Sequence, residues 1–202
     1  FIKDLQEHFT DDENLIVSLK MQGAQIDVWG VGTKLVTAYD QPALGGVYKL
    51  TAVKDGERGE WKYRIKLSEQ LAKVTTPGIH QVRRFKVDGL YAGDMIFDVR
   101  TAPATGGSIV DPFDPTRRKS FGGEVSYEDL LKPCVRSGKV VGGRDGIEKI
   151  RARRAADIKS LHAGIRRFLN PHAYPVGLEP QLYNLKYKMI LDQRQLPHEE
   201  IA

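Results

Sequence analysis

Apolar positions in the first 46 residues follow an alternation of strand and helix. Leu15–Val17 form a short apolar run that predicts the start of a buried strand, and Ser18–Gly23 predicts a helical turn that ends at Gly23. Ile26–Trp29 predicts the next strand, which leads into a glycine turn and a helix start. Further upstream, Ile2, Leu5 and Phe9 are spaced as on one face of a helix. This alternation is typical of an α/β region.

Between residues 47 and 115 the hydrophobic period changes to two. Trp61 and Tyr63 begin a run in which apolar and charged residues alternate, so we expect a strand with one buried face that includes Trp61. Turns are predicted at Asp88–Gly89 and Gly93–Asp94. The predicted strands cover residues 47–53, 61–67, 82–87 and 95–99. Together they predict an antiparallel β layer with one wet face.

The remaining residues, 116–202, predict a loop followed by helices. Residues 101–126 are dense in glycine and proline, which favours loop structure. Beyond Val140 one helical stripe joins Ile147, Ile150, Ile158, Leu161, Ile165 and Phe168. Asn170–Pro171 should stop that helix, and Leu178–Leu191 predicts a last one. The fold class is therefore α/β and α+β, in three parts that span 1–46, 47–115 and 116–202.

Composition limits the class of protein further. The chain has 202 residues, 41% hydrophobic and 28% charged, as expected for a globular protein with one sizeable core or two small ones. No apolar run approaches the length of a membrane span. Cys134 is the single cysteine, which excludes an intrachain disulfide, fits a cytoplasmic setting and predicts a small buried hydrophobe. The five histidines show no paired spacing, so we predict no metal site.

A net charge of +5 and a pI near 9.2 suit an anionic ligand, and they would also suit nucleic acid. Basic residues gather at Arg117–Lys119 and between Arg144 and Arg167, without interleaved aromatic residues. Such runs are usually solvated faces. We therefore predict no nucleic-acid partner.

The segment Trp29-Gly-Val-Gly-Thr-Lys-Leu35 has features of a phosphate-binding turn. Gly30, Val31, Gly32 and Thr33 can direct backbone N–H groups and one hydroxyl at an anion, with Lys34 as a further candidate. The segment is neither a dinucleotide fingerprint nor a P-loop, because the third glycine and the Gly-x-x-x-x-Gly-Lys spacing are missing. On this motif alone an ordinary tight turn is the alternative.

Three segments in this order closely resemble the nicotinate phosphoribosyltransferase family. The first is Trp29-Gly-Val-Gly-Thr-Lys-Leu followed by Gln41-Pro-Ala-Leu-Gly-Gly-Val-Tyr-Lys-Leu50. The second is Lys73-Val-Thr-Thr-Pro-Gly78, and the third is Asn170-Pro-His-Ala-Tyr-Pro-Val176. The resemblance implies the end of a TIM-like α/β barrel of the type II phosphoribosyltransferases, ahead of the β layer and the C-terminal helices.

The resemblance also implies an activity. Members of this family join nicotinate to 5-phosphoribosyl-1-pyrophosphate, giving nicotinate mononucleotide and pyrophosphate in NAD biosynthesis, with ATP hydrolysis and Mg²⁺. Carried over, Gly30, Val31, Gly32 and Thr33 would bind the 5′-phosphate. The family forms homodimers with shared active sites. The alternatives are a nicotinamide-using relative and a non-catalytic phosphate-binding or assembly module.

The second and third motifs leave two roles open. Lys73 and Thr75 could approach a phosphate, or their turn could simply link two strands. His80 stands where the family often has lysine. Asn170 and His172 are expected to cap and dock the C-terminal helices.

The resemblance covers only about the last two-fifths of a typical family member, so the chain alone should be catalytically incomplete. The nicotinate-binding residues and the phosphorylated histidine of the family have no counterpart here. At Val17–Ser18 the family has more helix and an acidic loop, and we expect that a segment is omitted there rather than deleted.

Overall fold

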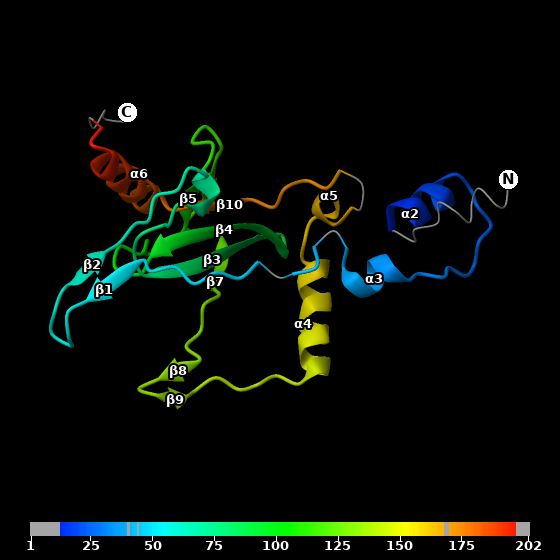
Figure 1. Ribbon diagram of the computed structural model, residues 1–202, viewed down its shortest axis with the longest axis horizontal. Coiled ribbons are helices and arrows are strands. Elements are labelled where there is room, and N and C mark those ends of the chain that lie inside the picture. Colours follow the sequence, from blue (N-terminus) through cyan, green and yellow to red (C-terminus); the bar gives the residue numbers. More distant parts are fainter. Residues whose placement is uncertain (1–12, 40, 44, 168–169, 197–202) are drawn as a thin grey trace. The chain divides into compact units, whose positions relative to one another are not determined.

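The computed structural model of the chain describes residues 13–39, 41–43, 45–167 and 170–196. It forms two compact units, residues 1–48 and residues 49–202 (Figure 1). The helical spacing predicted for Ile2, Leu5 and Phe9 lies outside the described residues, as does Phe168. The division into three parts at 1–46, 47–115 and 116–202 stays a prediction.

In unit 1 the described residues form two helices. The first, α2, runs from Glu13 to Met21, so the strand predicted at Leu15–Val17 is wrong. Leu15 and Leu19 are half-buried at a spacing of four, and this helical pattern outweighs a run of only three apolar residues. The predicted helix end is confirmed, because Gly23 has φ +80° and the Ala24 N–H donates to the Leu19 carbonyl at 3.0 Å.

The strand predicted at Ile26–Trp29 is also not formed. These residues have no ladder of hydrogen bonds to another described segment, and Val28 is 85% exposed. A strand requires a neighbour for its N–H and C=O groups, and the described part of this unit provides none. The predicted helix start is confirmed by α3, which spans Thr33–Thr37.

Unit 2 is built on a six-stranded mixed sheet (Figure 1). Its strands are β3 (His80–Val87), β4 (Leu90–Asp98), β5 (Gly107–Val110), β6 (Arg118–Phe121), β7 (Ser126–Asp129) and β10 (Val176–Leu178). Their order is β6-β5-β10-β4-β3-β7. All neighbouring strands are antiparallel except β10 and β4, which are parallel. The prediction of a purely antiparallel layer is therefore wrong at this one pair.

The turns between the predicted strands have mixed outcomes. The Asp88–Gly89 turn is confirmed, with φ +50° and +76° at its two residues. The turn predicted at Gly93–Asp94 is wrong, because β4 continues through both residues. At Gly93 the backbone of β4 passes close to the Phe121 ring and the Pro175 carbonyl oxygen. A close approach of this kind favours glycine within a strand.

Two small hairpins complete the strands. They pair β1 (Ala52–Lys54) with β2 (Trp61–Tyr63) and β8 (Val135–Arg136) with β9 (Lys139–Val140). Trp61 is 41% exposed, so its predicted burial is wrong. The inward alternation does persist beyond β2, since Tyr63, Ile65 and Leu67 are half-buried. The same correction applies to Cys134, which is exposed and not a buried hydrophobe.

The glycine-rich stretch 101–126 holds strands where a loop was expected. Gly106 and Gly107 adopt φ +55° and +129° at the start of β5, whose residues Ile109 and Val110 are 4% and 2% exposed. These glycines therefore help to position a short buried strand and do not prevent one from forming. Residues 116–202 likewise contain β6 to β10 besides helices.

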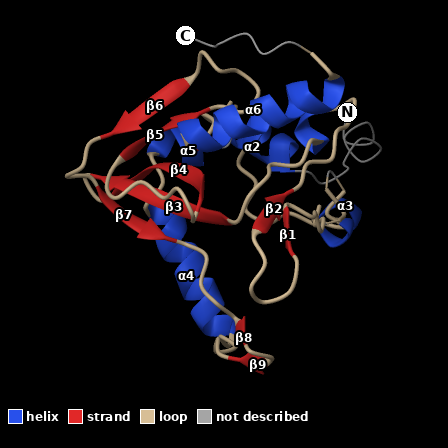
Figure 2. Ribbon diagram, turned by 90° about the vertical axis from the view of Figure 1, so that its left-hand side faces the viewer, coloured by secondary structure: helices blue, strands red, loops and turns tan. Residues whose placement is uncertain are grey.

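The helices of unit 2 are α4 (Ile147–Lys159), α5 (Ala163–Arg166), α6 (Pro180–Arg194) and the 3₁₀ turn η1 (Leu71–Lys73). In the predicted stripe Ile158, Leu161 and Ile165 are half-buried, whereas Ile147 and Ile150 are exposed. Helix α6 packs on β5 (Figure 2) and begins at the cap residue Glu179. None of the described helices has both the length and the apolar character needed to cross a membrane.

The core of unit 2 lies inside the curl of the sheet. It consists of Phe85, Met95, Phe97, Ile109 and Phe121. Figure 2 shows the curl, with β5 and β6 turned over the central strands. Leu178 in β10 and Leu182 in α6 are 2% and 1% exposed. Burial of these side chains is the main stabilising contribution.

Candidate functional site

The glycine turn of unit 1 presents unengaged backbone donors. Within the described residues, the N–H groups of Gly30, Val31, Gly32 and Thr33 donate no hydrogen bond. Gly30 and Thr33 are exposed, and a Cβ at Gly30 or Gly32 would meet no atom within 4 Å. An anion could therefore approach this backbone closely and satisfy its donors.

Helix α3 adds little to this turn by itself. It has five residues, and its N-cap residue is Gly32, which has no side chain to cap the first N–H groups. A helix this short carries a small dipole, so any anion affinity has to come from the N–H groups of the turn and from the Thr33 hydroxyl. The Lys34 ammonium lies 5.5 Å from the centre of the Tyr39 ring.

The Lys73–Gly78 turn is integrated into the framework of unit 2. Thr75 is 2% exposed, and its N–H donates to the Lys66 carbonyl at 3.1 Å. Lys73 is exposed, and its carbonyl accepts from the Lys49 ammonium at 3.2 Å. The phosphate role considered for Lys73 and Thr75 stays a prediction, and these contacts give the turn a structural role.

The end of this turn is closely packed. Gly78 has φ +108°, and a Cβ there would lie 2.7 Å from the Asp98 carboxylate. The His80 ring nitrogen Nε2 lies 2.9 Å from the Pro77 carbonyl oxygen. Pro77 and Gly78 are buried, and any other residue at position 78 would be strained at this φ.

The third sequence motif anchors the chain through an ionic network. Tyr174 donates to the Asp94 carboxylate at 2.8 Å. Arg84 forms two bonds with the same carboxylate, from Nε at 2.9 Å and from Nη2 at 2.7 Å. Burial raises the pKa of Tyr174, and the bond to Asp94 raises it further. The network joins adjacent strands β3 and β4 to the segment that leads into β10.

Sequence reasoning missed Arg84 and Asp94, which lie inside strands without a motif of their own. Their signal is an opposite charge pair at facing positions, because Arg84 and Asp94 are register partners. The expected docking of His172 is supported by its N–H, which donates to the Gly164 carbonyl at 2.9 Å. The Asn170 carbonyl accepts from Arg167 Nε at 2.6 Å.

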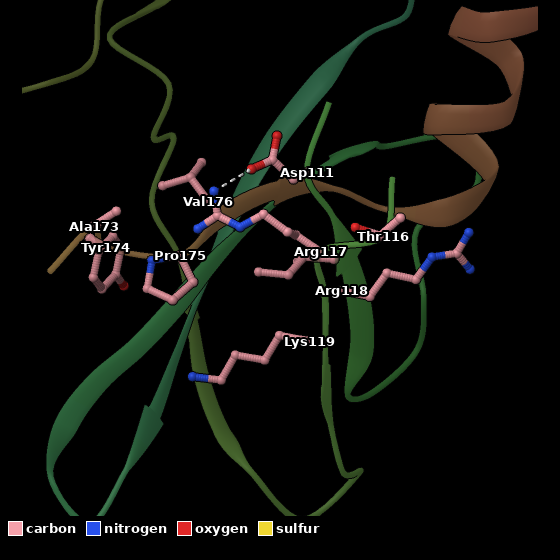
Figure 3. Close-up of a pocket in the computed structure, with 10 residues that line it drawn as sticks. Asp111, Thr116, Arg117, Arg118, Lys119, Ala173, Tyr174, Pro175 and Val176 are labelled. Atoms are coloured by element: carbon pink, nitrogen blue, oxygen red, sulfur yellow. Dashed lines mark ion pairs between the residues drawn. The ribbon is translucent and has the colours of Figure 1, made fainter. Parts of the chain in front are cut away.

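Beside Tyr174 lies a basic hollow of about 450 Å³ (Figure 3). Arg117 reaches toward Tyr174 there, and its guanidinium lies 3.6 Å from the Asp111 carboxylate. Lys119 donates to the Ala92 carbonyl at 2.6 Å. Figure 3 shows Arg118 directed away from Tyr174. The cations of the hollow are thus partly engaged and do not converge on one point.

The fold agrees with that of a solved structure. The crystal structure of human nicotinic acid phosphoribosyltransferase shares the mixed α/β fold with its curled sheet, at a TM-score of 0.57 and 24% identity. The similarity covers 91% of this chain and 32% of the human chain.

Residues 80–186 match the nicotinate phosphoribosyltransferase C-terminal domain, and the chain belongs to this family. The nicotinate phosphoribosyltransferase of Bacillus subtilis is 35% identical over 194 residues, which are 94% of this chain and 39% of that protein. Nicotinate phosphoribosyltransferase 1 of Arabidopsis thaliana is 31% identical, over 90% of this chain and 32% of that protein. The predicted family is confirmed, and the chain spans well under half the length of these relatives.

Proposed function

We propose that the chain is the C-terminal part of an enzyme that joins nicotinate to 5-phosphoribosyl-1-pyrophosphate. The products are nicotinate mononucleotide and pyrophosphate, and the reaction belongs to NAD biosynthesis. The observation that carries this proposal is the Gly30–Thr33 turn with its unengaged N–H groups, in a chain whose relatives are named for this activity. The barrel end expected for residues 1–46 is part of the same proposal.

In this function the glycine turn anchors the ribose 5′-phosphate. Backbone N–H groups of Gly30, Val31 and Gly32 and the Thr33 hydroxyl donate to its oxygens. Positive charge develops at the anomeric carbon as pyrophosphate leaves, and a fixed ribose keeps that carbon in line with the ring nitrogen of nicotinate. The contribution of this chain is therefore positioning.

ATP and Mg²⁺ are expected from the family resemblance, and ATP hydrolysis supplies driving force for the reaction when ATP is bound. Among the described residues, no three His, Cys, Asp or Glu side chains come together as a metal-binding group. Mg²⁺ is commonly held by one or two carboxylates together with substrate phosphates. No catalytic step is derived through Mg²⁺ or ATP.

The role of Thr33 is tested in the complete protein with Thr33→Ala. We expect binding of 5-phosphoribosyl-1-pyrophosphate to weaken by about 1–3 kcal/mol, as for a lost charge-assisted hydrogen bond. Thr37→Ala is the matched control, because the Thr37 hydroxyl donates to the Thr33 carbonyl within the same helix. Unchanged affinity in Thr33→Ala, measured by titration calorimetry, would remove Thr33 from the site.

A second measurement separates the proposed activity from its alternatives. The complete protein should use nicotinate and should not use nicotinamide in a steady-state assay. Preference for nicotinamide would assign the related activity, and phosphate binding without turnover of either base would indicate a non-catalytic module. We also propose that the complete protein is a cytoplasmic homodimer, which light scattering and cell fractionation would test.

A further inference from the structure

An open apolar groove runs along α6. It has a volume of about 360 Å³ and lies between α6, η1 and the turn before β6. Phe113, Leu71 and Tyr187 line it although they are 58%, 56% and 39% exposed. The rings of Tyr183 and Tyr187 stack with centroids 6.5 Å apart. We call this hollow the α6 groove.

The described residues that line the α6 groove include cations but no carboxylate. The cations are Lys186 and Arg194, and neither Asp nor Glu is among these lining residues. The Lys186 ammonium is partly buried and donates to the Thr76 hydroxyl at 3.1 Å. Within the part of the chain that the structure describes, neither Lys186 nor Arg194 forms an ion pair.

A second ammonium increases this charge imbalance. Lys49 lies close enough to act electrostatically on Lys186, and burial together with the Lys49 charge lowers the pKa of Lys186. Lys49 itself donates to the Lys73 carbonyl at 3.2 Å, on η1. Removing an ammonium from water without a counter-ion costs free energy, and an anion at Lys186 would offset that cost.

We propose that the α6 groove binds a small carboxylate with an apolar, ring-sized body. The body contacts Tyr187, Leu71 and Phe113, and the carboxylate pairs with Lys186. A volume of about 360 Å³ lies in the range of small-molecule sites. Charge complementarity selects an anion over a neutral ligand of the same shape. The proposal uses unit 2 alone, so it is independent of the proposed function.

The test compares two matched probes, 3-phenylpropionate and its neutral amide, by NMR titration of the full chain. We expect the acid to bind at least about tenfold more tightly than the amide. Lys186→Met should reduce this preference severalfold while the amide affinity stays unchanged. Lys188→Met is the control, because Lys188 is an exposed lysine on the same helix. Thermal melts verify that both variants fold.

Arg194→Gln provides an independent variant at the exposed end of α6. It should weaken binding of the acid by about two- to tenfold. Equal affinity for acid and amide, or a Lys186→Met chain that keeps the preference, would overturn the proposal. So would the absence of binding at about 10 mM of either probe. A chain dimer that Tyr187→Ala dissociates, with no probe binding, would assign the α6 groove to a second copy.

Discussion

Phe85 and Phe121 stack face to face, with ring centroids 4.0 Å apart and ring planes at 10°. They belong to β3 and β6, which β4, β10 and β5 separate in the sheet. Strands so far apart in a flat sheet could not bring two side chains together. The stack therefore shows how strongly the sheet curls, and it makes this pair the centre of the core.

Phe121→Ala should destabilise unit 2 strongly. Phe121 is 7% exposed, and its loss would leave a cavity beside Phe85 that the curled sheet cannot readily close. We expect a loss of about 3–5 kcal/mol in the free energy of unfolding, measured by urea titration. Phe113→Ala is the control, because Phe113 is 58% exposed and its removal should cost about 0.5 kcal/mol or less.

Gly93→Ala should be destabilising because the strand crosses Phe121 closely. A Cβ at Gly93 would lie 3.0 Å from Phe121 Cζ and 3.2 Å from the Pro175 carbonyl oxygen. We expect a cost of about 1–3 kcal/mol in the free energy of unfolding. Gly143→Ala, where a Cβ meets no atom within 4 Å, is the matched control.

A double-mutant cycle sharpens this prediction. Combining Gly93→Ala with Phe121→Leu should cost less than the sum of the two single changes, because the smaller side chain makes room for the new methyl group. Strict additivity in urea titrations would show that the crowding arises from Pro175 instead.

Tyr174→Phe should lower stability at neutral pH and flatten its alkaline dependence. The lost hydrogen bond to the Asp94 carboxylate is worth about 1.5–3 kcal/mol. Burial, and then the bond to Asp94, raises the pKa of Tyr174 above its ordinary value of 10.0, although Arg84 acts in the opposite sense. The folded chain therefore keeps a proton that the unfolded chain releases above about pH 10, so stability falls as pH rises there.

In Tyr174→Phe this alkaline contribution is absent, so its unfolding free energy should fall less steeply above pH 10 than that of the wild type. Some slope remains, because burial also raises the pKa of Tyr63. Chemical denaturation at several pH values measures both slopes. Parallel curves for the two proteins would show that Tyr174 does not titrate differently in the folded state.

Trp61→Ala should have a small effect, in contrast to a buried tryptophan. Trp61 is 41% exposed in the β1–β2 hairpin, so truncation leaves little cavity. We expect a cost of about 1 kcal/mol or less, rather than the roughly 3–5 kcal/mol of a core aromatic residue. A fall in melting temperature as large as that of Phe121→Ala would refute this reading of the hairpin.

How far the sequence predicts this molecule depends on whether the relevant forces are local. The Gly23 helix end and the Asp88–Gly89 turn are set by the chemistry of a few residues, and both were predictable. Trp61 was misplaced because alternation gives the side of a strand but not what covers it. The strand predicted at Ile26–Trp29 lacked a described neighbour, which no local pattern reveals.

The candidate site follows the same division. Gly30 to Thr33 were found because a glycine turn is a local motif, and the structure adds only that their N–H groups are unengaged. The bond of Tyr174 to Asp94 joins residues far apart in the chain, so spacing could not show it. Lys186 was not singled out, because its missing counter-ion becomes visible only once α6 packs beside Thr76.

The position of β10 in the sheet has a consequence for folding during synthesis. Val176–Leu178 pair between β4 and β5, so an interior strand is synthesised after the other five strands of this sheet. Until it arrives, β4 and β5 each have an unpaired edge that can bind other chains. The sheet is therefore completed only by a contact of long sequence separation, which slows folding and prolongs the exposure of both edges.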